Sequence, residues 1–365
     1  MIRVSLPARI NLVGSPTDAV EGAYATISAA VDLRGGAEID DADGIDFCRS
    51  DGSSAHFAAG PIADHRGFAV EAAAVNALRR YAPELSERLT RNGFALRTWT
   101  QVPASSGLAG SSVLLLAVLA ALRAFYKLDR KRYNDYVLAE IAQRAEEHDL
   151  GVVCGFADRY VPVFGDIAYL SYHGKLWHAA LGDEPYVTYE KLGALVPALE
   201  FCVATTGVQR HSGSVHEPMR QRYLEERKRG SGPLLAVARQ LGETAWRGKI
   251  ALLAGDLAAF GQQIARNQSL IDDMMRQCGF RSGAGDEVAC LVEAARRGGA
   301  LGAKLTGAGG GGAVFALPRP GEAQALADRL RTAGSSAGLR SSEVFVLPVT
   351  PTGLVVESPH DIGTG

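Results

Sequence analysis

The sequence is poor in cysteine and shows no framework for the few that it has. Its 365 residues include five cysteines, and none of them stands in C-x-x-C spacing. An odd and scattered set argues against the disulfide framework of a secreted domain and against a thiolate metal cluster. We therefore expect a cytoplasmic protein whose stability comes from a hydrophobic core.

An excess of charge of one sign and a long hydrophobic run are also missing. With 38 basic and 40 acidic side chains the formal net charge is −2, so no global field would recruit nucleic acid or an anionic membrane. The longest apolar run, residues 113–122, is closed by Arg123 well short of a membrane span, and the first residues lack the apolar core of a signal peptide. We expect neither nucleic acid nor a membrane as a partner.

Familiar nucleotide-binding signatures are absent or misplaced. The chain has no G-x-x-x-x-G-K-[ST] and neither H-R-D nor D-F-G, which argues against a P-loop NTPase and a protein kinase. Residues 307–312 satisfy G-x-G-x-x-G, but residues 313–317 continue as an apolar strand where a Rossmann turn would open a helix. A simple glycine hairpin is the alternative interpretation of that run.

What the chain does contain is a Gly/Ser-rich turn that leads directly into an apolar helix, at residues 101–122. Such a junction directs the first backbone N–H groups of the helix into a loop of small residues, which is a site for an anion. Gly107 and Gly110 permit a close approach of the backbone to a ligand. Taken alone, the serines of this turn could instead merely cap the helix.

The length of the chain favours two domains. Alternating and branched residues predict strands in the first half, at 2–13, 24–31, 36–39, 45–48 and 94–102. Helical spacing predicts helices there at 68–81, 113–122 and 133–147. The second half combines predicted strands at 199–205 and 343–349, and two short strands on either side of the glycine run within 303–317, with helices between 216 and 333. We predict an α+β protein with domains at 1–197 and 198–350 and a loosely held tail at 351–365.

Four separate motifs follow one another along the chain. They are Pro7-Ala8-Arg9 with Gly14 and Asp18, the loop at 103–112, Gly155-x-x-Asp158, and the run Lys304-Leu305-Thr306-Gly307 with the glycines after it. Each has an ordinary explanation in isolation, such as a surface salt bridge for Arg9 and Asp18. In this combination and order they resemble the motifs of the GHMP kinase superfamily, over residues 1 to about 350.

Within the superfamily the chain is most similar to sugar 1-kinases of the glucuronokinase type. The similarity lies in residues 14–18, 107–112 and 155–165, and in residues 212–216 with 220–223. Three positions depart from the common pattern: Ser105 and Ala109 stand where many members have Gly, and Ala157 stands where sugar kinases commonly have Gln.

The resemblance implies a fold and an activity. The fold would join an N-terminal domain like domain 2 of ribosomal protein S5 to a ferredoxin-like α/β sandwich, with the active site in the cleft between them. The activity would be ATP- and Mg²⁺-dependent phosphorylation of the anomeric hydroxyl of a sugar, with D-glucuronate and glucuronate 1-phosphate as the leading substrate and product. The partners would be the sugar and ATP, and the protein a monomer or homodimer.

The resemblance also implies roles for individual residues. Asp158 would accept or orient the proton of the sugar hydroxyl, and Arg9 would steady its charge. Ser112 and Glu147 would hold Mg²⁺; Glu146 is the competing choice, and the spacing of Glu147 from Asp158 favours Glu147. Asp18, Arg159, Thr306 and Gly307 would bind the substrate. The phosphate-binding set would be Pro103, Ser105, Ser106, Gly107, Leu108, Ala109, Gly110, Ser111, Ser112, Gly309 and Gly310.

Other functions stay open at this point. The same fold could act on a heptose phosphate, fucose, arabinose or a mevalonate-type acid, or it could be a non-catalytic sensor that binds a ligand. A uronic acid would need a cation for its carboxylate, and Arg159, Arg210 and Arg220 are candidates by position.

Overall fold

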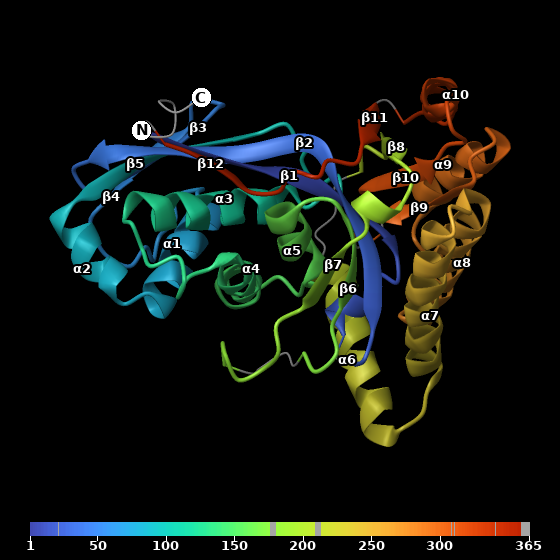
Figure 1. Ribbon diagram of the computed structural model, residues 1–365, viewed down its shortest axis with the longest axis horizontal. Helices are drawn as coiled ribbons and strands as arrows, with labels where there is room; N and C mark the ends of the chain where they lie inside the picture. Colours follow the sequence, from blue (N-terminus) through green and yellow to red (C-terminus); the bar gives the residue numbers. More distant parts are fainter. Residues whose placement is uncertain are drawn as a thin grey trace.

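The computed structural model describes residues 1–20, 22–175, 180–208, 213–307, 309, 311–339 and 341–358. Figure 1 shows two halves, each built around its own sheet, with the helices of the first half gathered under one face of the larger sheet. In the part of the chain that is described, no helix is both long and apolar enough to cross a membrane.

The larger sheet belongs to the first half and has the strand order β12-β1-β2-β5-β3-β4, with β6 and β7 continuing from β2. Its strands are β1 (Ile2–Val13), β2 (Ala25–Ala42), β3 (Ile45–Arg49), β4 (Ser54–Phe57), β5 (Gly93–Thr100), β6 (Ile167–Ser171), β7 (Thr188–Lys191) and β12 (Val355–Glu357). Among the described strands of this sheet, only β3 and β5 pair in parallel.

One long strand, β2, replaces the two shorter strands predicted at 24–31 and 36–39. The predicted gap, residues 32–35, ends at Gly35, and Gly36 opens the second predicted strand. A Cβ at Gly36 would lie 2.2 Å from the carbonyl oxygen of Val4 on β1 and 2.7 Å from the ring of Trp99 on β5. Glycine therefore lets β2 lie close to its two neighbours, β1 and β5, and the strand continues through it.

The helices of the first half are α1 (Ala69–Tyr81), α2 (Glu84–Arg91), α3 (Gly110–Phe125), α4 (Asp135–Arg144) and α5 (Ala157–Phe164). A π-helical turn, Ala145–Asp149, follows α4. Helix α3 packs on β1, β2 and α1, and nearly all of its residues from Ser112 to Arg123 are buried. This burial explains why α3 is apolar on all sides.

The second half has a four-stranded antiparallel sheet in the order β11-β8-β10-β9. Its strands are β8 (Glu200–Thr205), β9 (Gly302–Thr306), β10 (Ala313–Leu317) and β11 (Val344–Pro348). Its helices are α6 (Gly213–Arg229), α7 (Pro233–Leu253), α8 (Leu257–Gln277), α9 (Asp286–Arg297) and α10 (Ala323–Ser336). Helices between β8 and β9, and between β10 and β11, give the predicted ferredoxin-like arrangement.

A common hydrophobic core joins the two halves. Ile10 of β1 and Ile27 of β2 belong to the same buried cluster as Phe201, Phe260 and Phe315 of the second half. The edge of Phe201 faces the ring of Phe315, with 5.6 Å between the ring centres. Because this core continues beneath the junction, side chains from both halves can be held in fixed positions at one site.

The prediction of a loosely held tail is wrong for residues 351–358. Strand β12 pairs antiparallel with β1, with Val356 opposite Val4. The Leu354 N–H donates to the Val163 carbonyl of α5 at 2.9 Å, and Arg34 donates to the Gly353 carbonyl at 2.8 Å. The short apolar stretch 354–356 lacks the length that marks a strand in sequence, and an open edge of β1 supplies its partner. Residues 359–365 lie outside the described part.

Candidate active site

A cavity of about 410 Å³ lies at the junction of the two halves. Its walls come from β1 and the turn after it, the loop before α3, the segment between α4 and α5, helix α6, and the loop after β9. The predicted site residues on these walls are Arg9, Asp18, Pro103, Ser105, Ser106, Gly107, Ala109, Gly110, Ser111, Ser112, Asp158, Arg159, Thr306, Gly307 and Gly309.

Three predicted site residues are not on these walls. Leu108 is fully buried behind the loop, and its carbonyl accepts a hydrogen bond from the Arg9 N–H at 3.2 Å. Glu147 points to other partners, described below. Gly310 lies outside the described residues.

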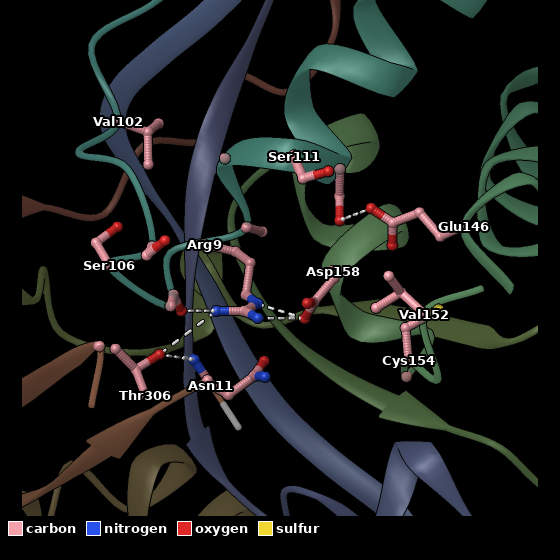
Figure 2. A pocket seen from close by; sticks show the side chains of 18 of the residues that line it. Arg9, Asn11, Val102, Ser106, Ser111, Glu146, Val152, Cys154, Asp158 and Thr306 are labelled. Carbon is pink, nitrogen blue, oxygen red and sulfur yellow. Dashed lines mark hydrogen bonds and ion pairs between the residues drawn. The ribbon is translucent and has the colours of Figure 1, made fainter. Parts of the chain in front are cut away.

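Arg9 and Asp158 form the centre of the site, as Figure 2 shows. Two guanidinium nitrogens of Arg9, Nε and Nη2, each lie 2.5 Å from Oδ1 of Asp158. The third nitrogen, Nη1, donates to the Gly107 carbonyl at 2.5 Å. Asp158 itself lies in the first turn of α5, where the helix dipole favours a negative charge. Arg9 therefore ties the Asp158 carboxylate to the loop before α3.

The two glycine-rich loops touch one another at this site. A Cβ on Gly107 would lie 2.5 Å from the Thr306 carbonyl oxygen, and one on Gly307 would lie 2.8 Å from Cα of Gly107. Both glycines also have positive φ, +71° and +91°. Thr306 is fixed beside them, since its hydroxyl accepts a hydrogen bond from the Asn11 N–H at 3.3 Å. Glycine is needed at both positions for the halves to meet here.

Two of the departures from the common family pattern fall on residues with left-handed backbone. Ser105 has φ +54° and Ala109 has φ +68°. Glycine adopts this region freely, whereas a residue with a Cβ is strained there by roughly 1 kcal/mol. The loop thus keeps the backbone shape for which glycine is best suited, at some cost in stability.

The carboxylate beside Ser112 is that of Glu146, and the placement predicted for Glu147 is wrong. The Ser112 hydroxyl donates to Oε1 of Glu146 at 2.9 Å. Glu147 instead accepts from Arg220 at 2.8 Å and from the Cys154 N–H at 3.3 Å. Both glutamates lie in the π-helical turn, where the helical register changes, so a residue count along the chain could not tell which one faces the cavity.

The loop end of the cavity has the donors and oxygens that a magnesium nucleotide needs. The Ser106 hydroxyl oxygen is covered from solvent and has no hydrogen-bond partner among the described residues. The loop, the start of α3, Ser112 and Glu146 line the same cavity as Ser106. Mg²⁺ is commonly held by one or two protein oxygens together with phosphate oxygens, so this set fits the ion.

The opposite end of the cavity contains Asp18, in a one-turn 3-10 helix at Thr17–Ala19. Its Oδ2 accepts a hydrogen bond from the Ala157 N–H at 3.1 Å, and a Cβ on Gly155 would lie 2.0 Å from that oxygen. Burial, together with the nearby charge of Asp158, raises the pKa of Asp18 to about 6. This end of the site therefore presents a buried carboxylate that can accept hydrogen bonds from hydroxyl groups.

Side chains of the second half hold the turn that carries Asp18. The Gly14 N–H is shared between Asn267 Oδ1 of α8 at 2.5 Å and the Thr244 hydroxyl of α7 at 3.0 Å. Lys304 of β9 donates to the Asn11 carbonyl at 2.9 Å and lies 3.2 Å from the Ser15 hydroxyl. Burial and the charge of Arg9 lower the pKa of Lys304 to about 7. The sequence analysis missed these three supports; only Lys304 stood within a recognised motif.

The described cations near the cavity are already paired. Arg159 forms an ion pair with Glu146 and donates to the Gly155 carbonyl at 2.5 Å, and burial lowers its pKa to about 9. Arg220 is bound to Glu147 and to the carbonyls of Cys154 and Ala19. Arg210, the third candidate for a sugar carboxylate, lies outside the described residues.

Comparison with known families identifies the class of this protein. The N-terminal domain model of the GHMP kinases matches residues 69–166, and their C-terminal domain model matches residues 249–336. The chain therefore belongs to the GHMP kinase family, whose members are ATP-dependent kinases.

Individual relatives include kinases of different sugars. The chain is 30% identical over 256 residues to glucuronokinase 1 of Arabidopsis thaliana, which is 70% of this chain and 66% of the plant protein, just under two thirds of it. It is also 30% identical over 302 residues to a galactokinase of Thermococcus kodakarensis, covering 75% of this chain and 77% of the relative. Among solved structures, Lactococcus lactis galactokinase complexed with galactose superposes with a TM-score of 0.78 at 18% identity, covering 97% of this chain and 95% of that one.

Proposed function

We propose that the protein transfers the γ-phosphoryl group of ATP to the anomeric hydroxyl of a sugar, with D-glucuronate as the first candidate substrate. The observation that carries the proposal is the Arg9–Asp158 pair, which lies between the glycine-rich loops and the buried carboxylate of Asp18. Phosphoryl transfer asks the protein mainly for positioning and charge neutralisation, and this arrangement offers both.

Each end of the cavity has a part in this proposal. When bound, ATP supplies the phosphoryl group and Mg²⁺ neutralises charge on its oxygens. Backbone amides of residues 106–112, the start of α3 and the Ser106 hydroxyl would hold the phosphates. Ser112 and Glu146 would hold the metal ion. Asp18 would accept hydrogen bonds from sugar hydroxyls at the other end.

At the centre, Asp158 accepts or orients the proton of the attacking hydroxyl. The hydroxyl oxygen bonds to the γ-phosphorus as the bond from that phosphorus to ADP breaks, and the proton passes to Asp158 or through it to solvent. Arg9 stabilises the carboxylate before transfer and lies beside the loop that holds the phosphates. An anomeric hydroxyl is more acidic than an ordinary alcohol, which makes its proton easier for a carboxylate to accept.

A neutral aldose is the second candidate substrate. Arg159 and Arg220 are both engaged by glutamates, whereas the carboxylate of glucuronate would call for a cation of its own. The similarity to a galactokinase over 77% of its length supports the same candidate.

An ADP-release assay over a panel of uronic acids, aldoses, heptose phosphates and mevalonate tests the proposal. We expect turnover with at least one free sugar. Activity with mevalonate alone would contradict it, and no activity with any member would favour a ligand-binding sensor.

The Asp158→Asn variant provides the matched control. We expect it to bind ATP with unchanged affinity and to lower kcat by about two to four orders of magnitude, because an amide cannot take up the proton. A kcat near that of the wild type would remove Asp158 from the catalytic role.

A further inference from the structure

His216 is a polar side chain on the cavity wall to which the proposed reaction assigns no role. It lies in the second turn of α6, and it shares the cavity with Asp18, Asp158 and Arg159. Helix α6 comes from the second half, so His216 faces α5 and the turn after β1 across the junction. His216 ends one of the stretches that resemble the glucuronokinases, residues 212–216, but that resemblance assigned it no role.

One ring nitrogen of His216 is left without a partner. Its Nδ1 is covered from solvent, and none of the described residues makes a hydrogen bond to it. A covered polar atom without a hydrogen bond destabilises a protein by roughly 1–3 kcal/mol. Because His216 lines the cavity, a ligand bound there can bring the missing group. The Ser106 hydroxyl is in the same condition at the phosphate end, so the two ends of the cavity each offer an unsatisfied polar atom.

The surroundings decide the charge of the ring. Arg220 lies one turn farther along α6, Asp158 and Arg159 come from α5, and Arg9 comes from β1. Burial of the ring and the three arginines outweigh the attraction of Asp158 and lower the pKa of His216 to about 4. At neutral pH the imidazole is therefore uncharged, with one nitrogen that donates and one that accepts.

An uncharged imidazole suits one kind of ligand group. A hydroxyl both donates and accepts, so it can satisfy Nδ1 in either tautomer of the ring. A carboxylate or phosphate would favour a charged partner, which the depressed pKa withholds. Asp158 and Arg9 take the reacting end of the substrate, which leaves the other hydroxyls of the sugar for Asp18 and His216.

We propose that His216 binds a non-reacting hydroxyl of the sugar through Nδ1 and thereby contributes to the choice of substrate. The inference rests on the proposed sugar kinase activity and adds to it a second contact, from the other domain, at the sugar end of the cavity. His216 would be a binding residue for the sugar and would leave the handling of ATP unchanged.

The test combines a variant with modified substrates. For His216→Ala we expect kcat/KM for the sugar to fall about tenfold, the effect of one lost hydrogen bond, with the KM for ATP unchanged. Gln221→Ala, an exposed change on the same helix, is the control and should match the wild type. His216→Gln, which keeps a donor and an acceptor, should recover part of the loss.

A series of deoxy analogues of the accepted sugar then identifies the partner hydroxyl. The wild type should lose about tenfold in kcat/KM with one analogue, whereas His216→Ala should process that analogue and the parent sugar equally well. Equal discrimination by both proteins, or an unchanged kcat/KM in His216→Ala, would overturn the inference while leaving the kinase activity established. A wild type inactive on every sugar would remove the proposed function, and with it the sugar as the partner of His216.

Discussion

At the scale of single residues, the cavity is organised by charges that are already paired. Arg9 holds Asp158, Arg159 holds Glu146, and Arg220 holds Glu147. Each pair joins two different elements, so each also fixes the relative position of those elements. Asp18 is the exception: burial and the like charge of Asp158 raise its pKa to about 6, so its charge changes just below neutral pH.

Asp18→Asn should stabilise the protein at neutral pH. The raised pKa means that the folded state binds a proton on Asp18 more tightly than the unfolded chain, so the charged form costs stability. The cost begins above pH 3.8, the ordinary value, and is complete above the folded value of about 6. A shift of this size corresponds to about 3 kcal/mol.

The measurement is urea unfolding of the wild type and of Asp18→Asn at several pH values. The stability gain of Asp18→Asn should be small near pH 4 and should grow to about 2–3 kcal/mol by pH 7. A gain that does not change with pH would show that Asp18 titrates normally. The same variant should have a raised KM for the sugar, since the buried carboxylate is placed to accept hydroxyl groups.

Glu146 and Glu147 offer a second comparison at this scale. Glu146→Gln should raise the Mg²⁺ concentration needed for half-maximal activity by at least about tenfold, because its carboxylate faces Ser112 in the cavity. Glu147→Gln removes the charge from the adjacent residue and should leave the Mg²⁺ titration unchanged. Equal effects of the two changes, or a larger effect of Glu147→Gln, would contradict the placement of the metal at Glu146.

At the scale of elements, prediction from sequence depended on length and periodicity. The strand at 2–13 and the helix that begins near Ser112 were predicted because their patterns extend over ten residues or more. Helix α2 was missed, since its apolar face consists of Leu85 and Leu89 alone. The π-helical turn was missed because nothing local marks the change of register, and this led to the error between Glu146 and Glu147.

The residues of the site divide in the same way, into those that a sequence motif predicted and those that packing alone places. Arg9 and Asp158 were named through motifs that keep their order in the chain, and the structure brings them together. Thr244 and Asn267 stand in helices without any such motif, and His216 stands in a similar stretch, residues 212–216, that assigned it no role. Their importance comes from the packing of α6, α7 and α8 against the first half, which no local pattern records.

The loop before α3 supports a prediction about strain. Ala109 has a left-handed backbone at the residue preceding the helix, so Ala109→Gly should stabilise the protein by roughly 0.5–1 kcal/mol after the entropy of glycine is deducted. Ala265→Gly, at an exposed position inside α8, should destabilise it by about 1 kcal/mol. Denaturant unfolding of the two variants checks the opposite signs, and a loss of stability in Ala109→Gly would refute the strain.

At the scale of the whole molecule, the chain closes on itself. The first strand, β1, carries Arg9, and the last, β12, pairs with its outer edge. Between them the chain builds the second half, whose side chains hold the turn of Asp18. The site is therefore assembled from segments that are far apart in sequence, and its geometry depends on both halves being folded.

The segment that returns to the first half also supports α5, the helix that carries Asp158. Thr350 accepts from the Asp166 N–H at 2.8 Å, and Leu354 donates to the Val163 carbonyl at 2.9 Å, at the end of α5. A Cβ on Gly353 would lie 2.2 Å from that carbonyl oxygen, so the two backbones are in close contact. Helix α5 begins at Ala157, carries Asp158 in its first turn and is only eight residues long, so a displacement of its end also moves its start.

Removal of residues 351–365 should therefore reduce activity as well as stability. We expect a lower urea midpoint, faster amide hydrogen exchange in α5, and a larger fall in kcat than in ATP affinity, because Asp158 loses the support of its helix while the phosphate loop keeps its own. Removal of residues 359–365 alone retains β12 and all of the contacts described above, and it should leave the three measurements at wild-type values. If the longer truncation destabilises the protein but spares both exchange in α5 and kcat, then β12 serves the sheet alone and α5 is held by its packing on α3, α4 and β1.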